Sequence, residues 1–105
     1  MAKDYLGLRR SQNDMIFMEI THNEGRFSMK TGHGEAELLY KMDGKIMSIY
    51  HTFVPEEDRG RGLAEKLAYS AFNFAKEKGM KVRPDCSYIV HFLEVNKEMK
   101  RYAVD

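Results

Sequence analysis

A short segment in the middle of the chain combines glycines and arginines in a way that suits phosphate binding. Its residues are Arg59-Gly60-Arg61-Gly62-Leu63-Ala64, and they precede a long helical pattern. The first turn of a helix has backbone N–H groups without intrahelical partners, and glycines let a phosphate come close to them. Arginine adds a planar, forked donor for phosphate oxygens. The segment predicts a pyrophosphate site; the alternative interpretation is a flexible turn with two solvated arginines.

The residues before this segment predict a set of strands that would position it. Asp43-Gly44, a pair typical of tight hairpin turns, separates two runs rich in apolar and β-branched residues. A second hairpin is expected around residues 23–25. The predicted strands cover residues 15–20, 26–30, 36–42 and 46–54. Four consecutive strands joined by short turns predict an antiparallel meander.

The residues after this segment predict a helix, a strand and another helix. Apolar residues recur at the spacing of one helix face from Leu63 to Ala75, and Gly79 suits a left-handed cap. Residues 80–83 predict a fifth strand, which should run parallel to the fourth because a helix connects them. Residues 88–99 predict a second helix. The expected fold is therefore mixed α+β or α/β, with a five-stranded mixed sheet and two helices.

The composition limits the functions that are compatible with the chain. Its 105 residues suit one domain, which we expect over residues 15–105 after a polar tail at residues 1–14. The 17 Lys and Arg residues against 16 Asp and Glu residues give a net charge of +1, which does not favour nucleic acid as a partner. No apolar run approaches the roughly 20 residues of a membrane span, and no secretion signal is recognisable. We expect a cytoplasmic protein that binds no membrane.

The motif at the predicted phosphate site resembles that of a known family. Arg59-x-x-Gly62-x-Ala64 is similar to the Gln/Arg-x-x-Gly-x-Gly/Ala signature of the GNAT acetyltransferases, and it follows the fourth predicted strand as it does there. Residues 51–55 and 82–88 extend the likeness to small GNAT-like proteins that have a cysteine after the fifth strand. The resemblance covers residues 15–102, and it implies a GNAT-like fold with acetyl-CoA as co-substrate.

The resemblance also implies which residues would hold the coenzyme. Backbone amides at the end of the fourth strand would pair with the pantetheine arm, and amides of the glycine-rich loop would bind the pyrophosphate. Pro84 lacks an N–H and is compatible with a gap between the fourth and fifth strands, although it could equally mark an ordinary strand end. The predicted coenzyme-binding residues are Phe53, Val54, Arg59, Gly60, Arg61, Gly62, Leu63, Ala64, Cys86 and Tyr88.

Cys86 and His51 are the two candidate catalytic residues. In the subfamily that the chain resembles, the matching cysteine lies beside the acetyl group and is suspected of accepting it, and a helix N-terminus after Cys86 would stabilise its thiolate. Strand alternation places His51 on the same face as Met47, Ile49 and Phe53, directed into the domain, where it could act as a base. The alternative is a packed cysteine and a core histidine. No metal site is expected.

Two functions remain open from the sequence. The first is transfer of acetyl from acetyl-CoA to a primary amine of a lysine, a protein N-terminus or a small molecule, with a partner protein as one acceptor. The second is a non-catalytic module that binds acetyl-CoA or another protein, favoured because residues 46–54 lack the carboxylate that larger acetyltransferases use as a base. A monomer is favoured over an oligomer. The acidic residues 56–58 are expected to point outward into solvent.

Overall fold

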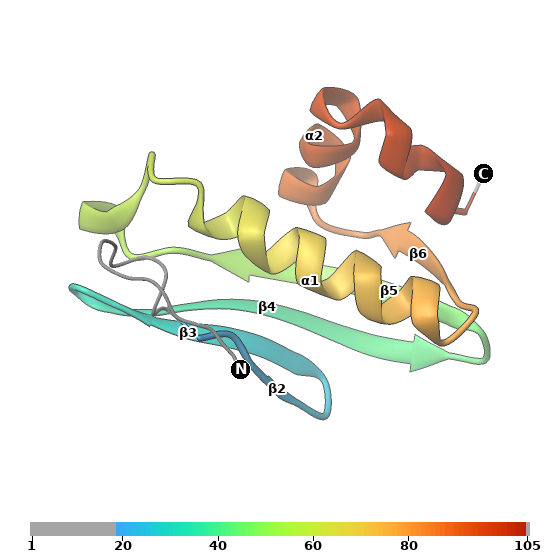
Figure 1. Cartoon of the computed structure of the whole chain (residues 1–105), viewed down its shortest axis with the longest axis horizontal. Coiled ribbons are helices and arrows are strands. Elements are labelled where there is room, and N and C mark those ends of the chain that lie inside the picture. Colours follow the sequence, from blue (N-terminus) through green and yellow to red (C-terminus); the bar gives the residue numbers. More distant parts are fainter. Residues whose placement is uncertain (1–18, 105) are drawn as a thin grey trace, which may run out of the picture.

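Five strands form one mixed sheet in the order β2-β3-β4-β5-β6 in the computed structural model, which describes residues 19–104 (Figure 1). Neighbouring strands from β2 to β5 are antiparallel, and β6 is parallel to β5. The strands are β2 (Thr21–Asn23), β3 (Arg26–Thr31), β4 (Gly34–Asp43), β5 (Ile46–Phe53) and β6 (Lys81–Pro84). The predicted meander followed by a parallel fifth strand is therefore confirmed.

The turn between β4 and β5 shows why the sequence specifies this hairpin. Asp43 pairs with Ile46, so the loop consists of Gly44 and Lys45. Gly44 has φ 62°, a conformation that costs little only for glycine, at the first position of a two-residue loop. The hairpin is confirmed, with the loop one residue later than Asp43-Gly44.

The first strand differs from the prediction. Residues 15–18 of the predicted strand 15–20 lie outside the described residues, and Glu19 and Ile20 are not in a strand. β2 instead occupies Thr21–Asn23, where it pairs with β3 across the loop of Glu24 and Gly25. All three residues of β2 are exposed. Because its three side chains do not alternate between apolar and polar types, this strand could not be predicted from a residue pattern. The predicted tail, residues 1–14, also lies outside the described residues.

The helix α1 (Leu63–Glu77) packs along one face of the sheet (Figure 1). Its buried side chains follow the predicted helix face and are Leu63, Leu67, Ala68, Ala71, Phe72 and Ala75. Gly79 has φ 70° just after the helix, as expected for a left-handed cap. Phe72 is fully buried and lies 5.3 Å, between ring centroids, from Phe92 of the second helix. The two helices therefore share one core on the same side of the sheet.

The second helix is shorter than predicted. α2 covers Ser87–Val95, and a separate 3-10 segment, η4 (Lys97–Tyr102), follows it in place of one helix over residues 88–99. Asn96 interrupts the helix because its side-chain amide donates to the carbonyl oxygen of Phe92 at 3.0 Å, while its side-chain oxygen accepts from the Tyr69 hydroxyl at 2.7 Å. An asparagine that satisfies backbone groups in this way competes with the helix ladder.

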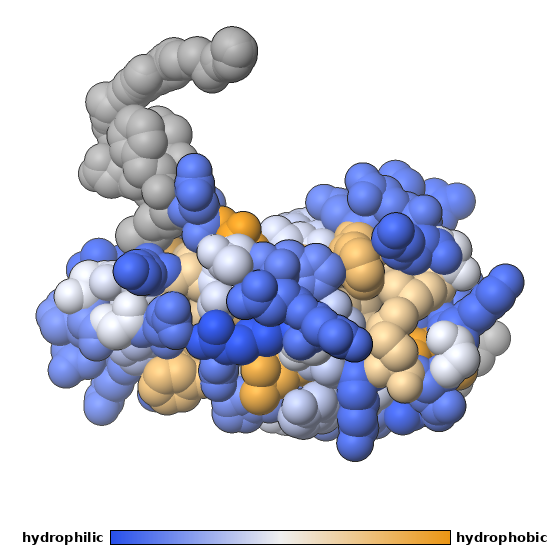
Figure 2. Space-filling model, turned by 90° about the horizontal axis from the view of Figure 1, so that it is seen from below, coloured by the Kyte–Doolittle hydropathy of each residue, from blue (hydrophilic) through white to orange (hydrophobic). Residues whose placement is uncertain are grey.

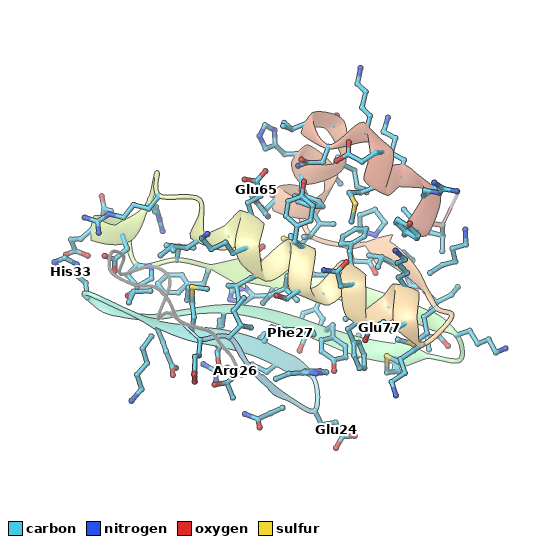
Figure 3. The ribbon with its side chains drawn as sticks, viewed as in Figure 1. Glu24, Arg26, Phe27, His33, Glu65 and Glu77 are labelled. Carbon is cyan, nitrogen blue, oxygen red and sulfur yellow. The ribbon has the colours of Figure 1, made fainter. Side chains whose placement is uncertain are left out.

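The other face of the sheet is polar. In residues 19–104 both helices lie on the face that carries the buried side chains of β3 and β4, and the alternate residues point away from α1. We call that second surface the polar face; on β3 and β4 it carries Arg26, Glu35, Glu37 and Lys41. Phe27 lies beside α1 in Figure 3, and Arg26 lies farther from it. Seen from below, the molecule is mostly hydrophilic, with apolar residues in separate patches (Figure 2).

The described helices are too short or too polar to cross a lipid bilayer. α1, at 15 residues, is the longest of them, and one of its faces is polar.

Candidate functional site

A gap opens where the pairing of β5 with β6 ends. The last paired residues are Ile49 and Pro84, and the amide of Asp85 donates to the carbonyl oxygen of Ile49 at 3.0 Å. Pro84 has no N–H to extend the ladder. Among residues 19–104, no strand lies on the β6 side of residues 50–53, so this part of β5 presents unpaired backbone toward the start of α2.

The glycine-rich loop lies at the outer end of this gap, immediately before α1. Gly60 has φ 84° and Gly62 has φ 76°, and a Cβ built on either residue would meet no atom within 4 Å. The backbone conformation favours glycine at both positions, and the space above them is open to a ligand. Arg59 donates from Nε to the carbonyl oxygen of Val54 at 2.9 Å, which ties the loop to the end of β5.

The gap and the loop together form a pocket of about 370 Å³, within the size range of small-molecule sites. The residues that line it are Thr52, Phe53, Val54, Asp58, Arg59, Gly60, Gly62, Leu63, Ala64, Glu65 and Tyr88. The structure thus brings together most of the residues named from the sequence. Arg61 is exposed and does not line the pocket, and neither does Cys86.

Asp58 is buried, which corrects the expectation that the acidic segment points outward. Its side chain is only 1% exposed and accepts hydrogen bonds from the backbone N–H and the Nδ1 of His33, each at 3.1 Å. Hydrogen bonds from the side chains of Thr31 and His33 hold the pKa of Asp58 below its ordinary value of 3.8. Asp58 therefore fastens the turn between β3 and β4 to the segment that leads into the glycine-rich loop. Glu56 and Glu57 are exposed, as expected.

We expect the Asp58→Asn variant to lower the melting temperature by several degrees at pH 7. The lowered pKa means that the folded state favours the carboxylate, so this stabilisation is present above pH 3.8 and is lost as the pH falls through the folded-state pKa. The difference in melting temperature between wild type and variant should shrink below about pH 4. Scanning calorimetry from pH 7 to pH 3 measures it. The Glu57→Gln variant, which changes an exposed carboxylate in the same segment, should behave like wild type; an equal loss in both variants would contradict this role.

Cys86 lies at the inner end of the gap. It is the residue before α2, and its Sγ is 2.9 Å from the Oγ1 of Thr52 on β5. The preceding residue, Asp85, accepts hydrogen bonds from the buried Ser48 hydroxyl at 2.6 Å and from the Nε of Arg83 at 2.7 Å. The bond from Ser48, followed by that from Arg83, lowers the pKa of Asp85. These contacts hold the turn between β6 and α2 in place, and with it the cysteine.

A β-bulge changes the alternation of β5 at the gap. Tyr40 of β4 pairs with Ile49, but its neighbour Leu39 pairs with His51, so Tyr50 is an extra residue on β5. A one-residue insertion in one strand turns every following side chain to the opposite face. The prediction that His51 points into the domain is therefore wrong.

The bulge separates the two candidate catalytic residues onto opposite faces of the sheet. Thr52 takes the position facing α1 and contacts Cys86, whereas the side chain of His51 lies on the polar face and is 45% exposed. Its Nε2 is 3.4 Å from the Oε2 of Glu37 on β4. His51 thus has a carboxylate neighbour that the sequence analysis did not identify, and it faces away from the cysteine.

Tyr88 and Glu65 complete the wall of the pocket on the helix side. Burial is the main cause that raises the pKa of Tyr88, with nearby Glu65 adding to it, so the phenol keeps its proton at neutral pH. Glu65 extends from the first turn of α1 toward α2 (Figure 3) and accepts a long hydrogen bond, 3.4 Å, from the Asn96 amide. Glu65, Thr52 and Asp58 also line the pocket but were not predicted to do so. The signal for them in the sequence is that they lie close to the glycine-rich motif.

No group of three or more His, Cys, Asp or Glu side chains within residues 19–104 is arranged to hold a metal ion.

Comparison with known proteins gives consistent matches. The family model for GCN5-related N-acetyl-transferases matches residues 26–102. The mouse protein NATD1 is 36% identical over 88 residues, which cover 81% of this chain and 80% of the mouse protein. The zebrafish protein NATD1 is 37% identical over 84 residues, covering 75% and 76% respectively. The solution structure of a GCN5-like protein from Staphylococcus aureus superimposes with a TM-score of 0.70 at 28% identity, covering 83% of this chain and 88% of that one.

Proposed function

Because the chain belongs to the family of GCN5-related N-acetyltransferases, we propose that it binds acetyl-CoA in the pocket between β5 and α1 and transfers the acetyl group to a primary amine. The observation that carries the proposal is the continuity of two features. The gap beside β5 and the glycine-rich loop open into the same pocket. One ligand with an extended polar arm and an anionic end would fill both.

The geometry of the loop suits the pyrophosphate of acetyl-CoA. The N–H groups of the first turn of α1 have no intrahelical acceptors, and the left-handed Gly62 directs the chain into that turn. A guanidinium whose Nε is already engaged with Val54 retains further donors for phosphate. The carboxylate of Asp58, the one nearest to the loop in sequence, is already engaged by hydrogen bonds from His33.

The unpaired part of β5 suits the pantetheine arm. An extended chain that contains amide groups can add to an exposed strand edge through backbone hydrogen bonds. In this chain the available edge is residues 50–53, and the pocket follows it from Thr52 to Val54. The arm would thus carry the thioester toward the inner end of the gap, near Thr52 and Tyr88.

The reaction would proceed by direct attack of the amine on the thioester. The amine nitrogen forms a bond to the carbonyl carbon, the carbon–sulfur bond breaks, and sulfur leaves with its electron pair. His51 would take the proton that the amine loses. Tyr88, whose phenol is protonated, would donate a hydrogen bond to the departing sulfur. No oxidant or metal ion is required for this balance.

The surroundings of Cys86 support direct transfer over a covalent relay. The polar side-chain contact of its sulfur is the Thr52 hydroxyl, and His51 lies on the other face of the sheet. A relay would need a base that removes the thiol proton. In this proposal Cys86 shapes the inner end of the gap and does not carry the acetyl group.

We expect the Cys86→Ser variant to keep at least about a third of the wild-type turnover, because a hydroxyl can retain the contact with Thr52. Intact mass spectrometry after incubation of the wild-type chain with acetyl-CoA should show no stable acetylation at Cys86. The Cys86→Ala variant is the second test. Loss of turnover by about 10³-fold or more in both variants would establish the cysteine as an obligatory carrier and contradict direct transfer.

The second candidate function is binding of acetyl-CoA without turnover. It is favoured because β5 carries no carboxylate and because His51 is exposed, whereas a catalytic base is expected to lie in a closed site. Titration calorimetry with acetyl-CoA and with coenzyme A tests the binding claim. Acetyl transfer to lysine peptides, to peptides with a free N-terminus and to polyamines then tests turnover. Binding with no transfer would leave the module; no binding would defeat both candidates.

A further inference from the structure

Glu37 lies at the centre of a set of contacts on the polar face. Its Oε1 accepts a hydrogen bond from the Nε of Arg26 at 2.9 Å, and its Oε2 lies 3.4 Å from the Nε2 of His51. Arg26 also donates from Nη1 to the Oγ of Ser28 at 3.1 Å and from Nη2 to the Oε1 of Glu35 at 2.7 Å. The carboxylate of Glu37 is therefore fixed through one oxygen and offers the other to the histidine. Glu37 is 26% exposed, the less exposed of the two carboxylates on Arg26.

The bulge places this contact beside the gap. His51 comes one residue after the extra residue of β5, in the part of the strand that β6 no longer covers. The next residue, Thr52, points to the opposite side and lines the coenzyme pocket. The inner end of the gap, where the thioester is proposed to lie, thus has the pocket on its α1 side and His51 on the polar face.

We propose that Glu37 is a positioning residue for His51, and that the acceptor is an alkyl amine that enters the gap from the polar face. The inference rests on the proposed acetyl transfer. A carboxylate next to Nε2 favours the tautomer that carries its hydrogen there, and this leaves the lone pair of Nδ1 free to take a proton from the amine. Arg26 keeps the carboxylate from rotating away.

The polar face also offers a contact for the chain that carries the amine. Phe53 pairs with Glu37 across the two strands and is 43% exposed. An apolar ring next to a carboxylate and an imidazole suits a lysine-like acceptor, whose methylene groups pack on the ring while its ammonium approaches the carboxylate. Arg26 and Lys41, two cations of this face, are engaged with Glu35 and Glu37 and with the Tyr50 ring.

The proton step is balanced by the acceptor, the side chain of His51 and solvent. The acceptor arrives as an ammonium ion, the imidazole removes a proton, and the free amine attacks the thioester. The proton on the imidazolium then passes to solvent, since His51 is exposed. Glu37 stabilises the imidazolium and remains a carboxylate throughout.

Glu37→Gln and Glu35→Gln form a matched pair for the test. Both remove one negative charge from the same strand face, and both carboxylates bind Arg26, but only Glu37 reaches His51. With the full chain and a lysine peptide as acceptor, Glu37→Gln should lower kcat by about 10-fold with little change in acetyl-CoA affinity. Glu35→Gln should keep kcat within about 2-fold of wild type. Melting temperatures of both variants show whether the fold is retained.

The decisive measurement repeats Glu37→Gln in a His51→Ala background. If Glu37 acts only through the histidine, the second substitution should change the residual kcat by less than about 2-fold, because the two effects are then not additive. Added imidazole should restore part of the rate of His51→Ala and less of the rate of the double variant, because Glu37 would also orient the added ring.

Three results would overturn the inference: equal losses in Glu37→Gln and Glu35→Gln, a further 10-fold loss in the double variant, or imidazole rescue that does not depend on Glu37. In each of these the wild-type chain still acetylates the peptide and the proposed function stands. A wild-type chain that binds acetyl-CoA but acetylates no amine would defeat the proposed transfer itself, and the inference with it.

Discussion

The Gly62→Asp variant is expected to lose affinity for acetyl-CoA by at least about 100-fold, which corresponds to roughly 2.7 kcal/mol. Gly62 is the residue before α1, and the space above its backbone is where the pyrophosphate is proposed to lie. A carboxylate there would occupy the space and repel the phosphates, and the helix N-terminus that should bind an anion would already be capped by one.

The Gly44→Asp variant provides a matched control. Gly44 also has a positive φ, 62° against 76° at Gly62, and a Cβ there would likewise meet no atom within 4 Å. The two substitutions therefore impose similar backbone strain and the same change of charge, but Gly44 lies in the turn between β4 and β5, away from the pocket. Titration calorimetry with acetyl-CoA, together with melting temperatures, separates the effects. Normal binding by Gly62→Asp would place the pyrophosphate elsewhere, and loss of binding in both variants would point to strain.

The parts of the fold that the sequence predicted are those determined by local chemistry. The face of α1 could be read because its buried residues recur at helical spacing, and the hairpin of β4 and β5 because Gly44 accepts a backbone conformation that other residues avoid. The parallel direction of β6 followed from the helical connection, since neighbouring strands that are joined by a helical crossover usually run parallel. These features need no information about distant residues.

The orientation of His51 could not be predicted, because it depends on the register of two strands. The types of residues 46–54 do not alternate strictly, and they do not mark Tyr50 as an extra residue. The bulge becomes visible only when β5 is aligned with β4, where Leu39 and Tyr40 take partners that are not consecutive. A single inserted residue reversed the predicted face and with it the relation between His51 and Cys86.

Burial of Asp58 was missed for a similar reason. Three consecutive acidic residues are usually solvated, and nothing in the sequence around them indicates that one of the three carboxylates is buried. The donors come from Thr31 and His33, more than twenty residues earlier, across the turn between β3 and β4. For the candidate site as a whole, the motif identified the loop and the strand end correctly, whereas the side chains that complete the pocket depend on how distant elements pack.

The His51→Ala variant is expected to lower kcat for amine acetylation by about 100-fold while acetyl-CoA affinity stays within about 2-fold of wild type. The split follows from the bulge: the side chain of His51 lies on the polar face and does not line the pocket in which the coenzyme is proposed to bind, whereas Thr52 lines that pocket from the α1 side. Stopped-time assays with a lysine peptide measure kcat, and calorimetry measures binding. His91→Ala, which removes an exposed histidine of α2 that does not line the pocket, should leave both quantities unchanged.

The outcome of this experiment also decides what the bulge is for. If His51→Ala loses turnover and keeps binding, the extra residue in β5 has a catalytic consequence, because without it the imidazole would face the core and Thr52 the polar face. If turnover is unchanged, the amine must lose its proton directly to water, and the contact between His51 and Glu37 only stabilises two adjacent strands. If binding falls together with turnover, the bulge serves the coenzyme, by fixing the backbone of residues 50–53 along which the pantetheine arm is proposed to lie.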